Sequence, residues 1–177
     1  MKPKLAQAYM ATARIFAELS HAKRLHVGAI VVKDDRIISI GYNGMPADWD
    51  NNCEDKEYSN GDEGGWLSPD EIEAQWPFEE LVHETQSDDT VWTHTRRFRL
   101  KTKPEVLHAE TNAIAKLARS SDSGLGADLF VTHSPCLDCA KLIYQSGISR
   151  VWYGAEYRSS DGPDFLRKSG VEVNKVE

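Results

Sequence analysis

LFVTHSPCLDCAKLIYQSGISRVWY, residues 129–153, contains three structural patterns in succession. An apolar run from Leu129 to Thr132 predicts a strand, Cys136 to Ser146 predicts a helix that ends at Gly147, and Val151 to Tyr153 predicts a second strand. Two strands joined by a helix are typical of a βαβ unit, whose strands are parallel. The stretch therefore predicts an α/β fold.

The segments on both sides of this unit extend the alternation. Near the N-terminus, apolar residues recur at three- and four-residue steps, which is the spacing of one helical face. Two β-branched runs follow, joined by the charged turn Lys33-Asp34-Asp35-Arg36, and this pattern indicates a hairpin. We therefore predict an α/β sandwich with a partly parallel sheet. The other predicted elements are a helix at 3–20, strands at 27–32 and 37–42, helices at 108–120 and 164–168, and a strand at 171–173.

A long polar segment interrupts the pattern after Gly41-Tyr42-Asn43-Gly44 and reaches about Glu105. Segments of this length are unusual in a compact domain and are more often functional than idle. Within it, Ser68-Pro69-Asp70-Glu71 has an N-cap serine, a proline at the first helical position and a glutamate at N3, so we predict a helix to about Thr85. No repeat or linker divides the chain, which predicts one domain over 1–177 with an insertion at about 48–105.

Composition narrows the class of protein. The hydrophobic fraction is 40% and the charged fraction 28%, as in ordinary globular proteins. The net charge of −7 argues against a broad nucleic-acid surface, and no apolar stretch has the length of a membrane span. We expect a cytoplasmic protein that binds neither membranes nor nucleic acid. The one basic cluster comprises Arg96, Arg97, Arg99, Lys101 and Lys103.

The residues with the clearest chemistry are two short motifs. Three cysteines are an odd, sparse set that favours metal or redox chemistry over disulfides. Cys136 and Cys139 open a predicted helix after Pro135, and His108 and Glu110 open another. Two thiolates and one imidazole are good zinc ligands that leave a fourth position for water, and a nearby carboxylate then moves protons. H-x-E followed by P-C-x-x-C is the signature of zinc deaminases, which predicts zinc at His108, Cys136 and Cys139 with Glu110 as the catalytic acid and base.

Each motif alone has a simpler explanation. A C-x-x-C pair is also found in redox dithiols and in structural zinc sites, and a His-x-Glu pair on a helix is usually surface. A redox dithiol explains neither His108 nor Glu110. The two motifs together, each at a helix start, therefore favour catalysis.

With these motifs the chain resembles the cytidine deaminase superfamily, and within it the deoxycytidylate deaminases of bacteriophages and eukaryotes. The resemblance covers about residues 1–50 and 104–175 and rests further on Gly41-Tyr42-Asn43-Gly44 and on Thr132-His133-Ser134-Pro135-Cys136. It implies a three-layer αβα sandwich around a mixed five-stranded sheet. It also implies hydrolysis of deoxycytidylate (dCMP) to dUMP and ammonia, which supplies dUMP for thymidylate synthesis in the cytoplasm, of the host cell if the chain is phage-encoded.

The resemblance also implies roles for residues outside the zinc motifs. Asn43 would bind the sugar hydroxyl, the backbone around Ala109 and Ser134 would meet the base, and Tyr153 would line the pocket. Packing within a strand is the alternative for Tyr153. The full substrate-binding set implied is Asn43, Ala109, Thr132, Ser134, Tyr153, Tyr157 and Arg158.

Regulation and assembly follow from the same resemblance. Relatives are activated by dCTP and inhibited by dTTP, usually with Mg²⁺, at a separate site, and they form hexamers. Gly41 and Gly44 would let the backbone approach the effector, and Lys23 and Arg24 would neutralise its phosphates. The alternative is a tight turn with ordinary surface charges. The effector set implied is Lys23, Arg24, Gly41, Tyr42, Asn43 and Gly44.

One position departs from the family pattern. Some phage relatives carry a second, structural zinc that uses a histidine two positions before the ligand histidine, and here Val106 stands there. This departure counts against a second zinc through Cys53, His83 or His94.

Three other functions stay open at this point. A deaminase of tRNA adenosine or polynucleotide cytosine shares the zinc and the glutamate but needs a basic groove for the strand. A zinc-stabilised binding module would tolerate loss of Glu110, because Glu110 is not a ligand. Riboflavin-pathway deaminases and competence proteins carry a similar signature, although the former normally continue into a reductase domain that this length leaves no room for.

Overall fold

The computed structural model describes residues 1–59, 68–85 and 91–176. The chain forms two compact units, one of Met1–Cys53 with Pro104–Glu177 and the other of Glu54–Lys103. The second unit is the inserted segment. The prediction of a single domain with an insertion stays a prediction, and the two units are described separately below. No helix in the described part of the chain is long and apolar enough to cross a membrane.

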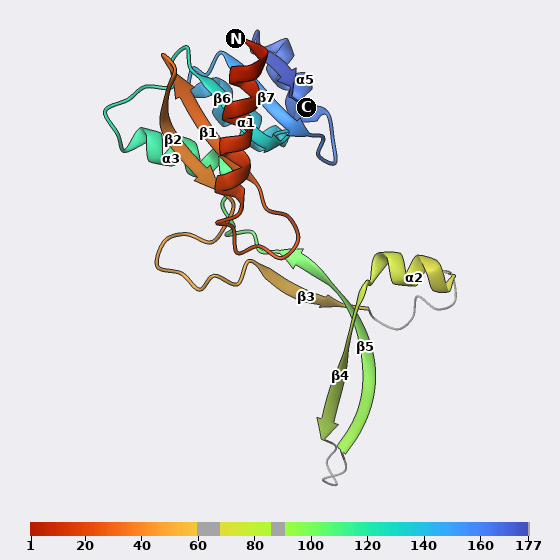
Figure 1. Cartoon of the computed structure of the whole chain (residues 1–177). Helices are drawn as coiled ribbons and strands as arrows, with labels where there is room; N and C mark the ends of the chain where they lie inside the picture. Colours follow the sequence, from red (N-terminus) through yellow and green to blue (C-terminus); the bar gives the residue numbers. More distant parts are fainter. Residues whose placement is uncertain (60–67, 86–90, 177) are drawn as a thin grey trace. The chain divides into compact units, whose positions relative to one another are not determined.

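The first unit contains a five-stranded sheet in the order β2-β1-β6-β7-β8 (Figure 1). Strand β1 pairs antiparallel with both β2 and β6, whereas β6, β7 and β8 are parallel. The predicted mixed five-stranded sheet is therefore confirmed. Its elements are α1 (Pro3–Ala17), β1 (Gly28–Lys33), β2 (Arg36–Tyr42), α3 (Ala109–Ala118), β6 (Asp128–His133), α4 (Leu137–Gln145), β7 (Arg150–Ala155), α5 (Asp161–Lys168) and β8 (Glu172–Lys175).

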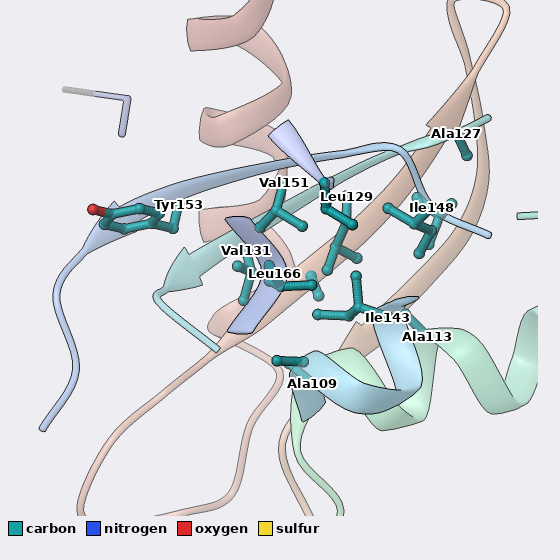
Figure 2. Close-up of a cluster of buried hydrophobic side chains, with 14 of the residues drawn as sticks. Ala109, Ala113, Ala127, Leu129, Val131, Ile143, Ile148, Val151, Tyr153 and Leu166 are labelled. Carbon is teal, nitrogen blue, oxygen red and sulfur yellow. The ribbon is translucent and has the colours of Figure 1, made fainter. Parts of the chain in front are cut away.

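Helices cover both faces of this sheet, because alternate residues of the central strands point to opposite sides. Ile30 of β1 and Phe130 of β6 pack with residues of α1 in one core cluster. Val31 and Leu129 pack with α3 and α4 in the other, larger cluster (Figure 2). The three-layer αβα sandwich expected from the sequence is confirmed.

Most predicted elements match in type, with shifts at their ends. The turn between β1 and β2 has two consecutive residues with positive φ, Asp34 at 50° and Asp35 at 55°. This is the conformation of a type I′ hairpin turn, in which aspartate is tolerated. Helix α5 begins at Asp161, three residues before the expected start, and α1 ends at Ala17 rather than near Ser20.

The second unit contains a three-stranded antiparallel sheet in the order β3-β5-β4. The helix predicted after Ser68 has its capping box: the Ser68 side chain accepts from the Glu71 backbone N–H, and the Glu71 side chain accepts from the Ser68 backbone N–H. The prediction that this helix continues to Thr85 was wrong. Pro77 follows the helix and disfavours a helical conformation at Trp76, after which the chain turns into a strand. The elements are β3 (Glu54–Tyr58), α2 (Pro69–Gln75), β4 (Phe78–Thr85) and β5 (Val91–Thr102).

Charge pairs between strands connect this small sheet. Arg97 lies 2.6 Å from Glu79, Arg99 lies 2.7 Å from Glu57, and Lys103 lies 3.6 Å from Asp55. Exposed pairs of this kind contribute little to stability, but they neutralise the charge of the basic side chains. Arg96, in addition, lies 4.4 Å above the Tyr58 ring. Most of the basic cluster seen in the sequence is thus already engaged within the unit.

Candidate active site

His108, Cys136 and Cys139 come together at the starts of two helices. His108 is the N-cap of α3, Cys136 is the N-cap of α4, and Cys139 lies in the first turn of α4. The Nδ1 atom of His108 lies 3.3 Å from Sγ of Cys139 and 3.6 Å from Sγ of Cys136. All three ligand atoms lie within 4.8 Å of one another. Within 1–59, 68–85 and 91–176, this is the only such group of three metal-binding side chains.

These donors fit a tetrahedral zinc ion. Zinc binds imidazole nitrogen at about 2.0–2.1 Å and thiolate sulfur at about 2.3 Å, which places neighbouring ligand atoms about 3.5 Å apart. The distances from Nδ1 of His108 to the two sulfurs are of this size. Three protein ligands leave one position open, as in catalytic zinc sites. The sequence prediction for the metal-binding residues therefore agrees with the geometry, and the zinc itself is taken up under Proposed function.

Hydrogen bonds and burial set the protonation of the three side chains. The Cys136 pKa is lowered to about 4, first by the hydrogen bond with Cys139 and then by that with His108. The Cys139 pKa is raised, chiefly by the same bond to Cys136 and by burial. The His108 pKa is raised, mainly by its hydrogen bond with Cys136. The site thus holds a thiolate at neutral pH, which attracts a cation.

Glu110 is a buried carboxyl group beside this trio. It lies in the first turn of α3, two residues after His108, and only 4% of it is exposed. Burial is the largest of the causes that raise its pKa. A carboxyl group with a raised pKa is suited to donate a proton as well as to accept one. The role of Glu110 as acid and base stays a prediction.

Residues 3–155 match the model of the cytidine and deoxycytidylate deaminase zinc-binding region. The matched residues include α3, α4 and the three side chains His108, Cys136 and Cys139 at their starts. The chain belongs to the cytidine and deoxycytidylate deaminase family.

Individual members of this deaminase family resemble the chain over most of its length. The deoxycytidylate deaminase of Enterobacteria phage T4 is 41% identical over 157 residues, which cover 85% of this chain and 78% of the relative. ComE operon protein 2 of Bacillus subtilis is 31% identical and covers 97% of this chain and 70% of the relative. The crystal structure of the dCMP deaminase of cyanophage S-TIM5 in complex with dCMP and dUMP has a TM-score of 0.71 and 40% identity, covering 99% of this chain and 98% of that one.

The deaminase residues expected to bind substrate lie at the ends of β6 and β7. Ser134 is buried, its N–H donates to the Ala155 carbonyl at 2.8 Å, and its Oγ accepts from the Tyr157 N–H at 2.8 Å. Ser134 thus connects the segment before the ligand Cys136 to the loop after β7. Thr132 Oγ1 accepts from the Gly28 N–H at 3.2 Å. For these residues the structure shows backbone contacts, and their contacts with substrate stay a prediction.

Tyr153, Tyr157 and Arg158 occupy different surroundings. Tyr153 is 8% exposed and belongs to the larger core cluster, and Figure 2 shows its hydroxyl pointing away from that cluster. Packing within the strand therefore accounts for its ring. Tyr157 and Arg158 are exposed, with the guanidinium 5.5 Å from the Tyr157 ring centroid. Ala109 is fully buried in the first turn of α3, and its contact with a base stays a prediction.

We expect Ser134→Ala to change substrate binding more than chemistry. The substitution leaves the part-buried Tyr157 N–H without its acceptor, which costs about 0.5–1.5 kcal/mol, the net value of an ordinary hydrogen bond, and loosens the loop after β7. KM should rise by about tenfold, because that loss of free energy falls on binding, with a smaller change in kcat. The control is Ser39→Ala, which removes another buried serine that donates to the Ala113 carbonyl at 2.7 Å. Equal KM values for both variants would contradict the role of Ser134.

Asn43 follows β2 and contacts the loop between α1 and β1. Its Oδ1 accepts from the Val27 N–H and its Nδ2 donates to the Leu25 carbonyl, each at 2.8 Å. Its own N–H donates to the Val27 carbonyl at 3.0 Å. These three bonds fix the loop between α1 and β1. The Asn43 side-chain amide can form further hydrogen bonds besides these. A hydrogen bond from it to a sugar hydroxyl stays a prediction.

The segment expected to bind effectors also contacts helix α3. A β-carbon on Gly41 would lie 2.1 Å from the Ala109 carbonyl oxygen, so the close approach that requires glycine is to α3. A β-carbon on Gly44 would meet nothing within 4 Å. Tyr42 lies beside α3, where Asn112 donates to its carbonyl at 2.9 Å. Lys23 and Arg24 lie exposed in the loop between α1 and β1, and effector binding by these six residues stays a prediction.

The two glycines provide a matched test of this packing. Gly41→Ala should lower the free energy of unfolding by at least about 1–3 kcal/mol, because the new methyl group overlaps the backbone of α3. Gly44→Ala should change it by less than about 1 kcal/mol. Urea denaturation of both variants without any nucleotide measures the difference. If the two variants were equally stable, the packing of Gly41 against α3 would not explain this glycine.

Several contacts around the site were not predicted from the sequence. Gly162 of α5 packs so closely on the ligand segment that a β-carbon would lie 2.0 Å from the Pro135 carbonyl oxygen. Gly44 and Leu107 form an isolated β-bridge directly before His108. Both contacts join residues far apart in the chain, so no local pattern signals them.

The residues considered for a second zinc have other surroundings. Cys53 is buried and packs with Ala22 and Val106 in a small apolar cluster. His83 and His94 lie on β4 and β5, where His83 hydrogen-bonds Thr93. None of these three belongs to the group of potential metal ligands described above.

Proposed function

We propose that the chain is a zinc-dependent deaminase that hydrolyses dCMP to dUMP and ammonia. The observation that carries this proposal is a trio of zinc ligands with a buried glutamate two residues from the ligand His108. The S-TIM5 structure, at 40% identity, is that of a dCMP deaminase with dCMP and dUMP bound, and the T4 relative is a deoxycytidylate deaminase. Similarity to these relatives is the reason to propose dCMP as the substrate over other cytosine-containing compounds.

The proposed mechanism divides binding and proton transfer among the chain's own residues. His108, Cys136 and Cys139 would hold the zinc, whose Lewis acidity would make water nucleophilic at neutral pH. Glu110 accepts a proton from the attacking water and delivers it to N3 of the base. Glu110 then takes the proton of the hydroxyl group now on C4 and passes it to the exocyclic amine, which leaves as ammonia as its bond to C4 breaks and the C4 carbonyl forms. Burial of Glu110 raises its pKa above the ordinary value for a carboxyl group, which favours the protonated form that donates.

The wider role proposed here follows the family. The dUMP produced would supply thymidylate synthesis, with dCTP as activator and dTTP as inhibitor, Mg²⁺ on the triphosphate, and a hexamer as the active assembly. The host or cell cytoplasm is the proposed location. Gly41 and Tyr42 contact α3, the helix that carries Glu110.

A nucleic-acid substrate fits the described residues less well. Binding a strand requires unpaired basic side chains that displace counterions. Arg97 and Lys103 of the basic cluster are instead paired with carboxylates, and Arg96 lies on the Tyr58 ring. A nucleoside monophosphate is therefore favoured over a nucleic-acid strand as the substrate.

A substrate panel tests this proposal. The purified chain is incubated with dCMP, CMP, deoxycytidine, dCTP and a cytosine-containing oligonucleotide, and loss of cytosine absorbance and release of ammonia are followed. We expect turnover of dCMP, faster with dCTP and slower with dTTP when Mg²⁺ is present. If only the oligonucleotide were turned over, the choice of dCMP as substrate would be wrong. If zinc-loaded protein turned over none of the compounds, the proposed deaminase activity would be wrong.

A further inference from the structure

A small apolar cluster lies close to the zinc site in sequence, apart from the two large core clusters. Ala22, Cys53 and Val106 are buried in it, and Met45 packs against them. The members come from the loop after α1, the segment after β2 and the segment before α3. Since none of the four lies in a helix or strand, their side-chain packing is a contact that joins these three segments.

Val106 is the member of this cluster that stands next to the site. It lies two residues before His108, is 8% exposed, and is followed by two exposed residues, Leu107 and His108. Leu107 and Gly44 exchange two backbone hydrogen bonds, of 2.9 and 3.1 Å. Ahead of His108, the chain is held by the packing of Val106 and by this backbone bridge, and the His108 carbonyl itself accepts from the Asn112 N–H at 2.9 Å.

We propose that Val106 is a positioning residue for the zinc site, an inference that rests on the proposed function. Its packing against Ala22 and Cys53 holds the backbone of residues 106–108, so that Nδ1 of His108 stays within reach of both sulfurs. Cys136 is likewise the N-cap of α4, but the segment before it is held by hydrogen bonds of Ser134 with Ala155 and Tyr157. His108 is thus the ligand whose preceding segment packs into this apolar cluster.

The size of the effect follows from the geometry of metal sites. A ligand must stay within a few tenths of an ångström of its bonding distance, and loss of a group that orients a ligand lowers metal affinity about 10- to 100-fold. Truncation of Val106 leaves a cavity, and the segment has few hydrogen bonds that resist collapse into it. His108 would then shift relative to the two cysteines.

Val106→Ala and Val171→Ala provide the test. Val171 is buried to a similar extent, at 6% exposed, but belongs to the large core cluster. Zinc affinity is measured by competition with a chromophoric chelator, and the cobalt-substituted proteins are compared by visible absorption, which reports ligand geometry. We expect Val106→Ala to weaken zinc binding about tenfold and to alter the cobalt spectrum. Val171→Ala should lower thermal stability and leave both readouts unchanged.

Two results would overturn the inference. One is Val106→Ala with the zinc affinity and cobalt spectrum of the unchanged protein. The other is a loss of zinc affinity in both variants that follows their loss of stability. If Val106→Ala does not fold, Val106→Thr replaces it in the test. Threonine has nearly the shape of valine but carries a hydroxyl in place of one methyl group, and the same two readouts apply with the same expected changes. Failure of the unchanged protein to bind zinc is a different result and would overturn the proposed function.

Discussion

Glu110→Gln is expected to lower kcat for dCMP by about 100- to 10,000-fold, the range that general acid–base groups contribute. Glutamine has nearly the same shape and cannot accept the proton of the attacking water or return it to the base. Because Glu110 is not a ligand, zinc content should remain one per chain. Steady-state kinetics and metal analysis on the same preparation measure both quantities.

The matched control for this variant is Glu105→Gln, which removes an exposed carboxyl group in the segment before α3. Its kcat should stay within about twofold of the unchanged protein, since exposed substitutions away from special features have small effects. If Glu110→Gln retained full turnover, Glu110 would not be the acid and base. The chain would then be better described as a zinc-stabilised binding module.

Cys136→Ser and Cys139→Ser should each remove the zinc and with it the activity. Serine replaces a soft thiolate that zinc prefers with a hydroxyl that is rarely a zinc ligand. We expect metal content near zero after dialysis and no measurable dCMP turnover. Atomic absorption of the purified variants gives the zinc content.

Asp138→Asn is the control for these two variants. Asp138 lies between the cysteines, is exposed, and pairs with Lys141 at 2.6 Å. The substitution removes a charge from the same turn without removing a ligand, so zinc content and turnover should stay near those of the unchanged protein. Zinc retained by either serine variant would mean that the trio is not the metal site.

The fold and the catalytic trio were predictable because their signals are local. Apolar periodicity gave the type of each element in the first unit, and Gly147 marked the end of α4, where its φ is 79°. The zinc motifs lie at helix starts, so the spacing of Cys136 and Cys139 within one turn already placed both sulfurs together. His108 was linked to them only by the known order of the two motifs.

The parts that could not be predicted depend on contacts between distant segments. Residues 78–85 carry helix-forming residues, but pairing with β5 makes them a strand, and Pro77 was the one local signal against a helix. Gly41 was expected to serve a ligand, yet what comes close to it is the backbone of α3. Ser134 was expected at the base and is engaged with Ala155 and Tyr157. Sequence identified these residues, and only the fold showed what each one contacts.

Titration of zinc into the metal-free protein tests the central claim most directly. Zinc is removed with a chelator, returned in measured steps, and dCMP turnover is followed at each step by loss of cytosine absorbance together with release of ammonia. The account predicts no turnover without zinc, a rise in proportion to the zinc added, and a plateau at one zinc per chain with one ammonia for each dUMP. Full turnover by metal-free protein, or zinc binding at the trio with no turnover at any step, would contradict it.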